Sequence, residues 1–328
     1  MPFSVMPSSG HSERTAVSAV GLRKSYGGKT VLDGVDLSIP AGSVFALLGP
    51  NGAGKTTTVQ ILSTLLAADS GTARVLGRDV TDDPDGVRRV IGVTGQFAAV
   101  DGLFTAEENL RLMADLHHLD RREGGRRAAE LLERFELTEA AGRPAMTFSG
   151  GMRRKLDLAM TLVGRPRVIF LDEPTTGLDP RSRRTMWEII RSLVADEGVT
   201  LLLTTQYLEE ADQLADRIAV LDHGVLVAEG TADELKRRAP GGHLRLRFAD
   251  TARLAAAEHC FPVAVRDDEA LALRVPGDGT PATLRAVLDV LETAGAEAES
   301  VTVHTPDLDD VFLALTGGGA PAREESLR

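Results

Sequence analysis

Apolar runs and helical patterns alternate along the first two thirds of the chain. Residues 43–48 are apolar apart from Ser43, and they lead through a glycine-rich loop into residues 57–66, which we expect to form a helix. Four consecutive apolar residues, 168–171, have the composition of a strand that is buried on both faces of a sheet. Such strands need helices on both faces, so the pattern predicts an α/β fold with a parallel sheet.

The pattern changes in the middle of this region, where helical spacing dominates. Residues 106–119 and 126–135 carry apolar side chains at helical spacing, and charged residues and a pair of glycines separate them. The apolar positions are Leu110, Met113, Leu131, Leu132 and Phe135. The pattern predicts a helical subdomain of about residues 97–165 within a larger domain of residues 15–238.

A second, smaller domain is expected near the C-terminus. Residues 239–242 include a proline and two glycines, which end a helix and make the backbone flexible, so a domain boundary is expected there. The expected strands are 244–248, 263–265, 271–275 and 300–304, and the expected helices are 251–259, 281–294 and 308–315. This order predicts a small α+β domain over residues 243–317. Residues 1–14 are expected to be a disordered lead and residues 318–328 a flexible tail.

The loop after the first apolar run matches the phosphate-loop pattern G-x-x-x-x-G-K-[ST] at every fixed position. Its glycines let the backbone N–H groups turn toward phosphate oxygens, and the following helix adds the partial positive charge of its N-terminus. Lys55 is expected to reach the β- and γ-phosphates of a nucleotide, and the Thr56 hydroxyl to bind Mg²⁺. The alternative is a glycine-rich turn with an unrelated lysine. The residues assigned to nucleotide binding are Gly49, Pro50, Asn51, Gly52, Ala53, Gly54, Lys55, Thr56 and Thr57.

Two carboxylates follow the apolar run 168–171. Asp172 and Glu173 come at the C-terminal end of the expected strand, which is the edge where open α/β sheets bind ligands. Asp172 is placed to hold Mg²⁺, usually through water. Glu173 is the candidate to orient and polarise an attacking water, because successive side chains along a strand project to opposite sides. The alternative is an ordinary acidic loop after a strand.

A further motif identifies the kind of phosphate-loop protein. Ser149, Gly150, Gly151 and Met152 open another expected helix, whose N-terminus is a second anion site. This stretch resembles the signature of ATP-binding-cassette ATPases, and the resemblance covers about residues 17–236. In that family the signature grips the γ-phosphate of the nucleotide held by another copy. The resemblance implies an α/β phosphate-loop NTPase cassette that works as a homodimer and binds ATP and Mg²⁺.

Three more positions match cassette elements in the expected order. Tyr26 resembles the aromatic residue that stacks on adenine, and the alternative is a half-buried strand tyrosine. Gln96 ends an apolar run and matches the glutamine that contacts Mg²⁺ and couples the site to a partner. Asp179 lies in a loop that resembles the contact between two cassettes, and it is also suited to start the next helix before Pro180. Both roles are compatible.

The sequence departs from the cassette pattern at two places. Gln206 stands where most cassettes carry a histidine, and a glutamine amide donates a hydrogen bond but does not become a cation. Charge-assisted hydrogen bonds contribute roughly 1.5–3 kcal/mol against about 1 kcal/mol for neutral ones, so slower turnover is expected rather than inactivity. Gln206 is therefore assigned with Glu173 to catalysis. The signature is preceded by Phe148 and ends in Met152, where leucine and glutamine are commoner.

The composition of the chain limits the classes of molecule that it is expected to bind. The chain has 37 Lys and Arg against 48 Asp and Glu, for a net charge of −11, which argues against nucleic acid. Its single cysteine, Cys260, excludes a disulfide framework. No stretch approaches 18 consecutive apolar residues, so transport requires a separate transmembrane permease, with this chain peripheral at the cytoplasmic face of the cell membrane. The permease is expected to dock near Phe97, Ala98, Leu103 and Phe104; ordinary helix packing is the alternative.

Two stretches narrow the family further. Residues 206–214 and 308–317 are similar to those of daunorubicin and doxorubicin resistance ATPases, which implies drug or antibiotic export through the membrane subunit. The second stretch also suits simple packing, since Leu308, Val311, Phe312 and Leu315 share one helical face. Other interpretations are a cassette of an importer, or of an exporter of another substrate such as lipid or polysaccharide. A nonenzymatic ATP-binding regulator is a weaker alternative.

Overall fold

The chain divides into two compact units, residues 1–229 and 230–328, which are described separately. The computed structural model describes residues 15–96, 99–238, 242–304 and 307–316. The predicted lead and tail lie outside these residues. Helix α8 (Ala232–Arg238) belongs to the second unit, whereas the sequence placed its residues at the end of the first domain.

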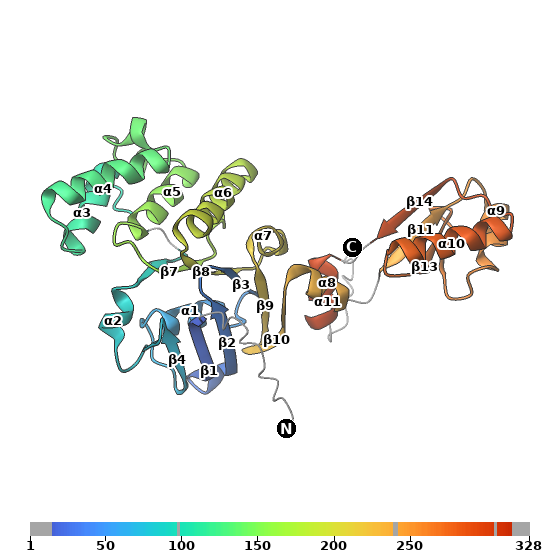
Figure 1. Ribbon diagram of the computed structural model, residues 1–328, viewed down its shortest axis with the longest axis horizontal. Helices are drawn as coiled ribbons and strands as arrows, with labels where there is room; N and C mark the ends of the chain where they lie inside the picture. Colours follow the sequence, from blue (N-terminus) through green and yellow to red (C-terminus); the bar gives the residue numbers. More distant parts are fainter. Residues whose placement is uncertain (1–14, 97–98, 239–241, 305–306, 317–328) are drawn as a thin grey trace, which may run out of the picture. The chain divides into compact units, whose positions relative to one another are not determined.

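A six-stranded sheet forms the centre of the first unit (Figure 1). Its order is β10-β9-β3-β8-β7-β6, and the pairs β9–β3, β3–β8, β8–β7 and β7–β6 are parallel. Strands β3, β7 and β8 are buried along their whole length, as the apolar runs of β3 and β7 predict. The strands are β3 (Val44–Leu48), β6 (Ile91–Thr94), β7 (Val168–Asp172), β8 (Thr200–Thr205), β9 (Arg217–Asp222) and β10 (Val225–Gly230).

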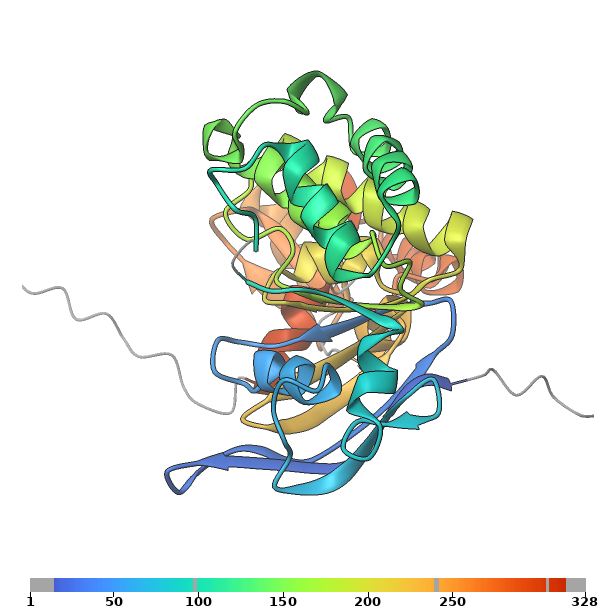
Figure 2. The ribbon, with the colours of Figure 1, turned by 90° about the vertical axis from the view of Figure 1, so that its left-hand side faces the viewer.

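A second sheet, antiparallel and not predicted from the sequence, covers one side of the first (Figure 2). Its order is β2-β1-β4-β5, and its strands are β1 (Thr15–Tyr26), β2 (Lys29–Pro40), β4 (Ser70–Val75) and β5 (Arg78–Asp79). Helix α1 (Lys55–Leu62) shares one apolar core with both sheets, through Val59, Ile61 and Leu62. The short helix α2 (Pro84–Arg88) leads into β6.

Helices cover the other side of the parallel sheet (Figure 2). They are α3 (Ala106–Leu116), α4 (Arg121–Arg134), α5 (Gly150–Thr161), α6 (Pro180–Glu197) and α7 (Leu208–Leu214), with 3₁₀ turns at Thr138–Ala140 and Ala145–Thr147. Helix α4 begins five residues before its predicted start. Asp120 caps it by accepting from the N–H groups of Arg122 and Glu123, and Gly124 fits closely against Ala114.

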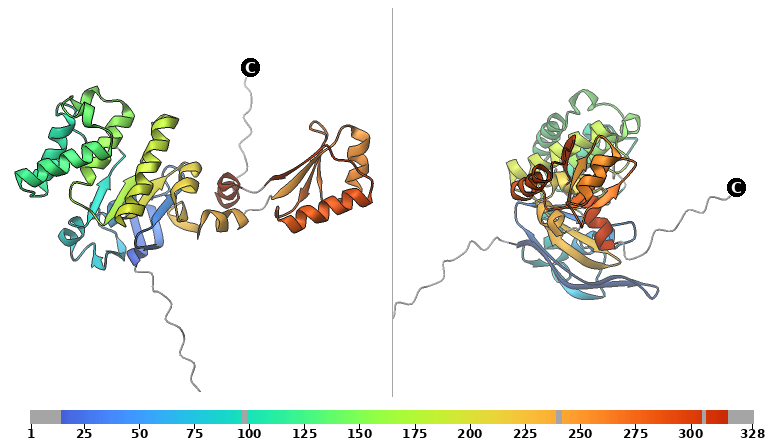
Figure 3. Two further views of the ribbon diagram at one scale, coloured as in Figure 1. Left: turned by 45° about the horizontal axis from the view of Figure 1, so that its top comes forward. Right: turned by 90° about the vertical axis from the view of Figure 1, so that its right-hand side faces the viewer.

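The second unit contains a four-stranded antiparallel sheet of order β12-β13-β11-β14 (Figure 3). Apolar side chains of β11 and β13 form one core with helices α9 and α10, as an α+β domain requires. The elements are β11 (His243–Arg247), α9 (Thr251–Glu258), β12 (Val265–Asp267), β13 (Ala272–Pro276), α10 (Pro281–Thr293), β14 (Ser300–His304) and α11 (Leu308–Thr316).

One strand of this unit differs from its prediction, and one helix has a different packing partner. Strand β12 lies at Val265–Asp267 rather than at residues 263–265, and Val263 is exposed in the preceding turn. Helix α11 packs against α8, with Leu308 and Val311 buried. Over the described parts of both units, every helix is too short or too polar to cross a membrane.

Candidate active site

The phosphate loop joins β3 to α1 with a backbone that glycine permits. A Cβ atom at position 49 would lie 2.2 Å from the carbonyl oxygen of Leu221, so Gly49 is required by close packing. Gly54 has a left-handed φ of 109° and stands at the N-cap of α1. The helix therefore starts at Lys55, two residues before its predicted start, and its first N–H groups face the loop.

Lys55 is buried at the start of α1. Its Nζ donates to the carbonyl oxygens of Gly49 at 2.7 Å and Pro50 at 3.1 Å, and lies 3.6 Å from Oε1 of Glu173. Burial lowers the pKa of Lys55, and the charges of Glu173 and Asp172 oppose that shift. The ammonium group is thus desolvated and held between the loop and two carboxylates.

Asp172 ends β7 and lies within hydrogen-bond reach of the phosphate-loop helix. The Thr56 hydroxyl donates to Asp172 Oδ1 at 3.2 Å, and the Thr204 hydroxyl of β8 donates to the same oxygen. The side chain of Asp172 is 4% exposed. These contacts bring together the two residues predicted to hold Mg²⁺ through oxygen atoms.

Glu173 follows directly, in an unusual backbone conformation. Its φ is 50°, a left-handed value that costs a non-glycine residue energy. Its N–H group donates to the carbonyl and the hydroxyl oxygens of Thr204, both at 3.1 Å, and Thr176 donates to Oε2 at 3.2 Å. The carboxylate is therefore fixed beside Lys55 by a turn that the surrounding structure holds in place.

The strand order places Gln206 between the phosphate loop and the carboxylates. Strand β8 pairs with β3 on one side, Thr205 opposite Leu48, and with β7 on the other, Thr204 opposite Asp172. Gln206 is the next residue after β8 and is half-buried. The position suits a side chain that contacts the terminal phosphate of a nucleotide.

Gln96 lies just beyond β6, on the other side of β7. Thr94 pairs with Leu171, so the chain leaves β6 beside the strand that carries Asp172. Gln96 itself is exposed. The predicted docking residues Phe97 and Ala98 lie outside the described residues.

The signature residues form a separate helix start. Ser149 caps α5 by accepting from the N–H of Met152 at 3.2 Å, and Ser149 and Gly150 are exposed. A Cβ atom at Gly151 would lie 2.7 Å from the Ser182 hydroxyl. Among the described residues, no hydrogen bond joins positions 149–152 to the phosphate loop.

Asp179 and Tyr26 are both on the surface of the first unit. Asp179 caps α6 by accepting from the N–H groups of Arg181 and Ser182, and the Ser182 hydroxyl lowers the pKa of its carboxyl. The role of starting a helix is thus observed. Tyr26 ends β1 and is 46% exposed, with the Lys24 ammonium 5.6 Å from its ring centre. Its ring is open to a stacking partner.

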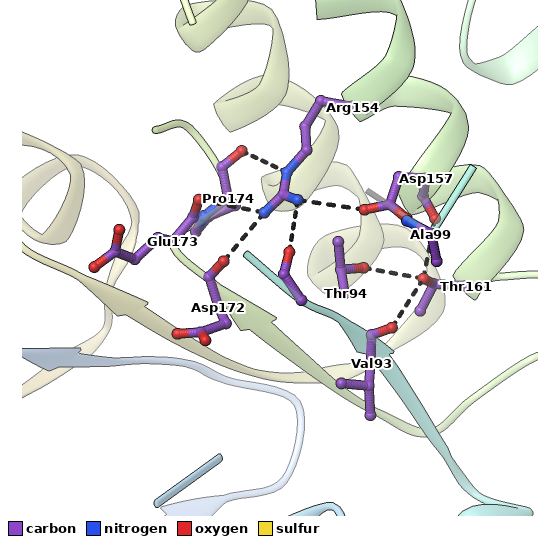
Figure 4. Close-up of polar contacts among 10 residues, drawn as sticks. Val93, Thr94, Ala99, Arg154, Asp157, Thr161, Asp172, Glu173 and Pro174 are labelled. Carbon is purple, nitrogen blue, oxygen red and sulfur yellow. Dashed lines mark hydrogen bonds and ion pairs between the residues drawn. The ribbon is translucent and has the colours of Figure 1, made fainter. Parts of the chain in front are cut away.

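Three buried charges near the site were not predicted. Arg154 and Asp157 of α5 contact the segment around Gln96 and the turn of Glu173 (Figure 4). Glu210 of α7 accepts from the Thr175 hydroxyl and the Trp187 indole. Their only sequence signal is a charge within a helical pattern, which is equally typical of a solvent-facing position.

The donors at the site suit Mg²⁺ rather than a metal held by protein alone. The described residues contain no group of three or more histidine, cysteine, aspartate or glutamate side chains that could hold a metal ion. Mg²⁺ is usually held by one or two carboxylates together with substrate phosphates and water. The hydroxyl of Thr56 and the carboxylate of Asp172, 3.2 Å apart, are therefore a fitting donor pair.

Comparison with known proteins gives both a family and close relatives. A family model described as ABC transporter matches residues 32–176. The chain is 50% identical over 313 residues to the daunorubicin/doxorubicin resistance ATP-binding protein DrrA of Streptomyces peucetius, covering 94% of each chain. It is 37% identical over 330 residues to Nod factor export ATP-binding protein I of Ralstonia nicotianae, covering 97% of this chain and 98% of that one.

Solved structures give the same fold. The ATP-binding subunit of an ABC transporter matches with a TM-score of 0.62 and 30% identity, over 68% of this chain and 93% of that one. A dimeric ATP-binding cassette in a post-hydrolysis state, bound to ADP and phosphate, matches with a TM-score of 0.60 and 27% identity, over 66% of this chain and 98% of that one.

Proposed function

Because the chain belongs to the ATP-binding-cassette family of transporter ATPases, we propose that it powers export of a drug or antibiotic through a separate membrane subunit. The observation that carries the proposal is the gathering of Lys55, Thr56, Asp172 and Glu173 at the carboxyl edge of one parallel sheet. The name of the Streptomyces peucetius relative supports the class of substrate.

Each side chain at this edge of the sheet has a separate role in ATP hydrolysis. Lys55 exchanges its carbonyl partners for phosphate oxygens, which are stronger acceptors because they are charged. Glu173 orients a water molecule for attack on the terminal phosphorus and accepts its proton. Gln206 donates to the terminal phosphate from the neighbouring strand. Tyr26 stacks on the adenine ring.

Thr56 and Asp172 would hold Mg²⁺ at the phosphates, with Gln96 as a further ligand. When bound, the ion supplies positive charge that offsets the charge of the phosphate oxygens. The Thr204 hydroxyl fixes the Asp172 carboxylate, so that its free oxygen keeps a constant direction.

A complete site needs two chains. Each chain has one phosphate loop and one signature, and the signature faces solvent at the start of α5. Its N–H groups and the Ser149 hydroxyl suit the γ-phosphate of a nucleotide held by another copy. We therefore assign Ser149, Gly150, Gly151 and Met152 to the partner's nucleotide, and Asp179 to the same interface. The likeness to a dimeric cassette supports this arrangement.

Export requires a membrane subunit, since the described residues contain no helix suited to crossing a bilayer. The chain would then lie at the cytoplasmic face of the membrane, held there by that subunit. The relative named for Nod factor export shows that a similar chain serves a different substrate. Transport assays therefore include daunorubicin and the Nod factor.

Glu173→Gln tests the catalytic assignment. The amide keeps the shape but cannot accept a proton, so steady-state hydrolysis should fall by at least about 10²-fold while ATP affinity is retained. Glu188→Gln, an exposed carboxylate on α6, is the matched control and should leave both unchanged. Full turnover by the Glu173→Gln protein would refute the role of Glu173.

The export proposal is tested in cells that express the chain with its genomic-neighbour membrane protein. Efflux of daunorubicin should require both chains and should stop with Glu173→Gln. Efflux that persists with Glu173→Gln would overturn the proposal. Transport of the Nod factor and not of daunorubicin would change the proposed substrate class and leave the proposed ATPase role in place.

A further inference from the structure

Arg154 is a buried arginine of α5 that binds the backbone at the end of β7 and just after it (Figure 4). Its Nε donates to the carbonyl oxygen of Pro174 at 2.9 Å, and its Nη2 donates to those of Asp172 and Glu173, each at 3.2 Å. The carboxylates of Asp172 and Glu173 point away from the guanidinium in this view. Arg154 thus holds three consecutive peptide groups without binding either acidic side chain.

The backbone that Arg154 holds is the strained part of the site. Glu173 has a φ of 50°, and a non-glycine residue keeps such a conformation only where its surroundings impose it. The Thr204 carbonyl and hydroxyl fix the N–H side of Glu173, and the guanidinium fixes the carbonyl side. The direction of the Glu173 carboxylate therefore depends on Arg154.

The same guanidinium also binds the segment that contains Gln96. Nη1 donates to the Gly95 carbonyl at 2.7 Å and to Asp157 Oδ2 at 3.3 Å, so all five N–H donors of Arg154 are used. Asp157, one helical turn along α5, accepts from the N–H of Ala99 at 2.9 Å through its other oxygen. Arg154 and Asp157 therefore bind the chain on both sides of Gln96.

We propose that Arg154 is a positioning residue that, with Asp157, ties Gly95 and Ala99 to the Glu173 turn, so that displacement of these two residues redirects the carboxylate. The proposal rests on the proposed catalytic role of Glu173. Helix α5 also begins at the signature serine, so one rigid element joins the signature, the Gln96 segment and the catalytic turn.

The chemistry of the site requires arginine rather than lysine. The planar fork of a guanidinium meets several acceptors in fixed directions, whereas an ammonium has three donors around one point. Arg154→Lys keeps the positive charge beside Asp157 but cannot reach Gly95, Asp157 and all three carbonyls together. It should loosen the turn while leaving the phosphate loop intact.

The first experiment compares Arg154→Lys with Arg127→Gln in the full chain. Arg127 is also a buried arginine of the helical region, but its guanidinium binds Glu130 and the Leu162 carbonyl, away from the carboxylates. Arg154→Lys should lower kcat on the order of 10- to 100-fold with KM for ATP little changed, since misplacement of a catalytic group acts on the chemical step. Arg127→Gln should lower Tm without lowering kcat.

Two outcomes would overturn the positioning role. One is a wild-type kcat for Arg154→Lys. The other is an equal loss of kcat in Arg127→Gln at matched Tm, which would make the effect of Arg154→Lys general destabilisation. If Glu173→Gln abolishes turnover while Arg154→Lys keeps the wild-type kcat, only this inference fails. If Glu173→Gln retains turnover, the proposed function itself fails.

The second experiment tests the link through Asp157. Asp157→Asn retains an oxygen for the Ala99 N–H but removes the charge that meets Arg154. In vesicles, the membrane subunit should no longer stimulate ATP hydrolysis by the Asp157→Asn chain. Hydrolysis by the Asp157→Asn chain alone should change less. Stimulation equal to wild type would show that Asp157 does not carry the link.

Discussion

At the scale of single residues, the buried carboxylate of Glu210 makes the folding stability of this protein depend on pH. It is fully buried on α7, where it accepts from the Thr175 hydroxyl at 2.8 Å and the Trp187 indole at 3.2 Å. Burial raises the pKa of Glu210 above its ordinary 4.5, and these hydrogen bonds and the charge of Arg183 oppose the shift only in part. The Arg154 guanidinium is a second positive charge acting on it.

A raised pKa means that the folded state binds the proton more tightly than the unfolded state. The stabilising effect of that proton is present below pH 4.5 and is lost as pH rises through the folded-state pKa. We expect Glu210→Gln, which does not titrate, to gain stability relative to wild type as pH rises from about 5 to 8. Urea unfolding followed by fluorescence of Trp187, the single tryptophan, measures this directly.

The Glu188→Gln protein serves as the control because Glu188 is exposed on the same helix as Trp187. Its stability should stay parallel to wild type across the pH range. A stability difference between Glu210→Gln and wild type that is independent of pH would mean that folding does not raise the pKa of Glu210.

Buried charges such as Glu210, Arg154 and Asp157 mark the limit of prediction at the scale of single residues. The phosphate loop and the carboxylates after β7 could be assigned because their motifs are local and their order along the chain is fixed. The partners of Arg154 lie on three separate segments, at Gly95, Asp157 and residues 172–174. Only the tertiary fold brings these segments together.

At the scale of elements, an exposed apolar patch on the helical region bears on the membrane partner. Leu103 is 79% exposed, Met146 64% and Phe104 39%. Their segments are joined by hydrogen bonds from the N–H of Met146 to the Gly102 carbonyl and from the N–H of Ala145 to the Phe104 carbonyl. Contiguous exposed apolar side chains are typical of contact surfaces.

Leu103→Glu should therefore abolish co-purification with the membrane subunit while ATP binding is retained. A charge at an apolar contact is unfavourable because it loses its hydration without gaining a partner. Leu65→Glu is the matched control, since Leu65 is 69% exposed after α1 and outside the patch. Normal co-purification of the Leu103→Glu protein would exclude this docking surface.

The observed ends of the helices and strands show which structural features the sequence pattern predicts well. The strands at 43–48 and 168–171 are found nearly as predicted, because a run buried on both faces has no competing pattern. Helix α4 starts at Arg121 rather than 126, because Asp120 caps it and Gly124, interpreted with Gly125 as a separator, instead allows α4 to approach Ala114. In the antiparallel sheet, Gly27 and Gly28 join β1 to β2 in a two-residue turn, a local hairpin signal that the prediction did not use. The pairing of β1 with β4 joins distant parts of the chain and has no local motif.

At the scale of the whole molecule, the proposed dimer requires that a chain be incomplete by itself. Lys55 and Glu173 belong to the half that holds the nucleotide, and Ser149 belongs to the half that closes over the nucleotide of a partner. Two inactive chains with defects in different halves should then assemble one complete site in a mixed dimer. Two chains with defects in the same half should not.

Mixing Lys55→Ala with Ser149→Arg tests this arrangement. Each protein alone should be nearly inactive, and the mixture should recover about one quarter of the wild-type rate per chain, since random assortment makes about half of the dimers mixed and each has one intact site. Lys55→Ala mixed with Glu173→Gln is the control and should recover nothing, because both defects lie in the nucleotide-holding half. If the first mixture also stays inactive while dimers still form, the signature does not act on the nucleotide of the other chain.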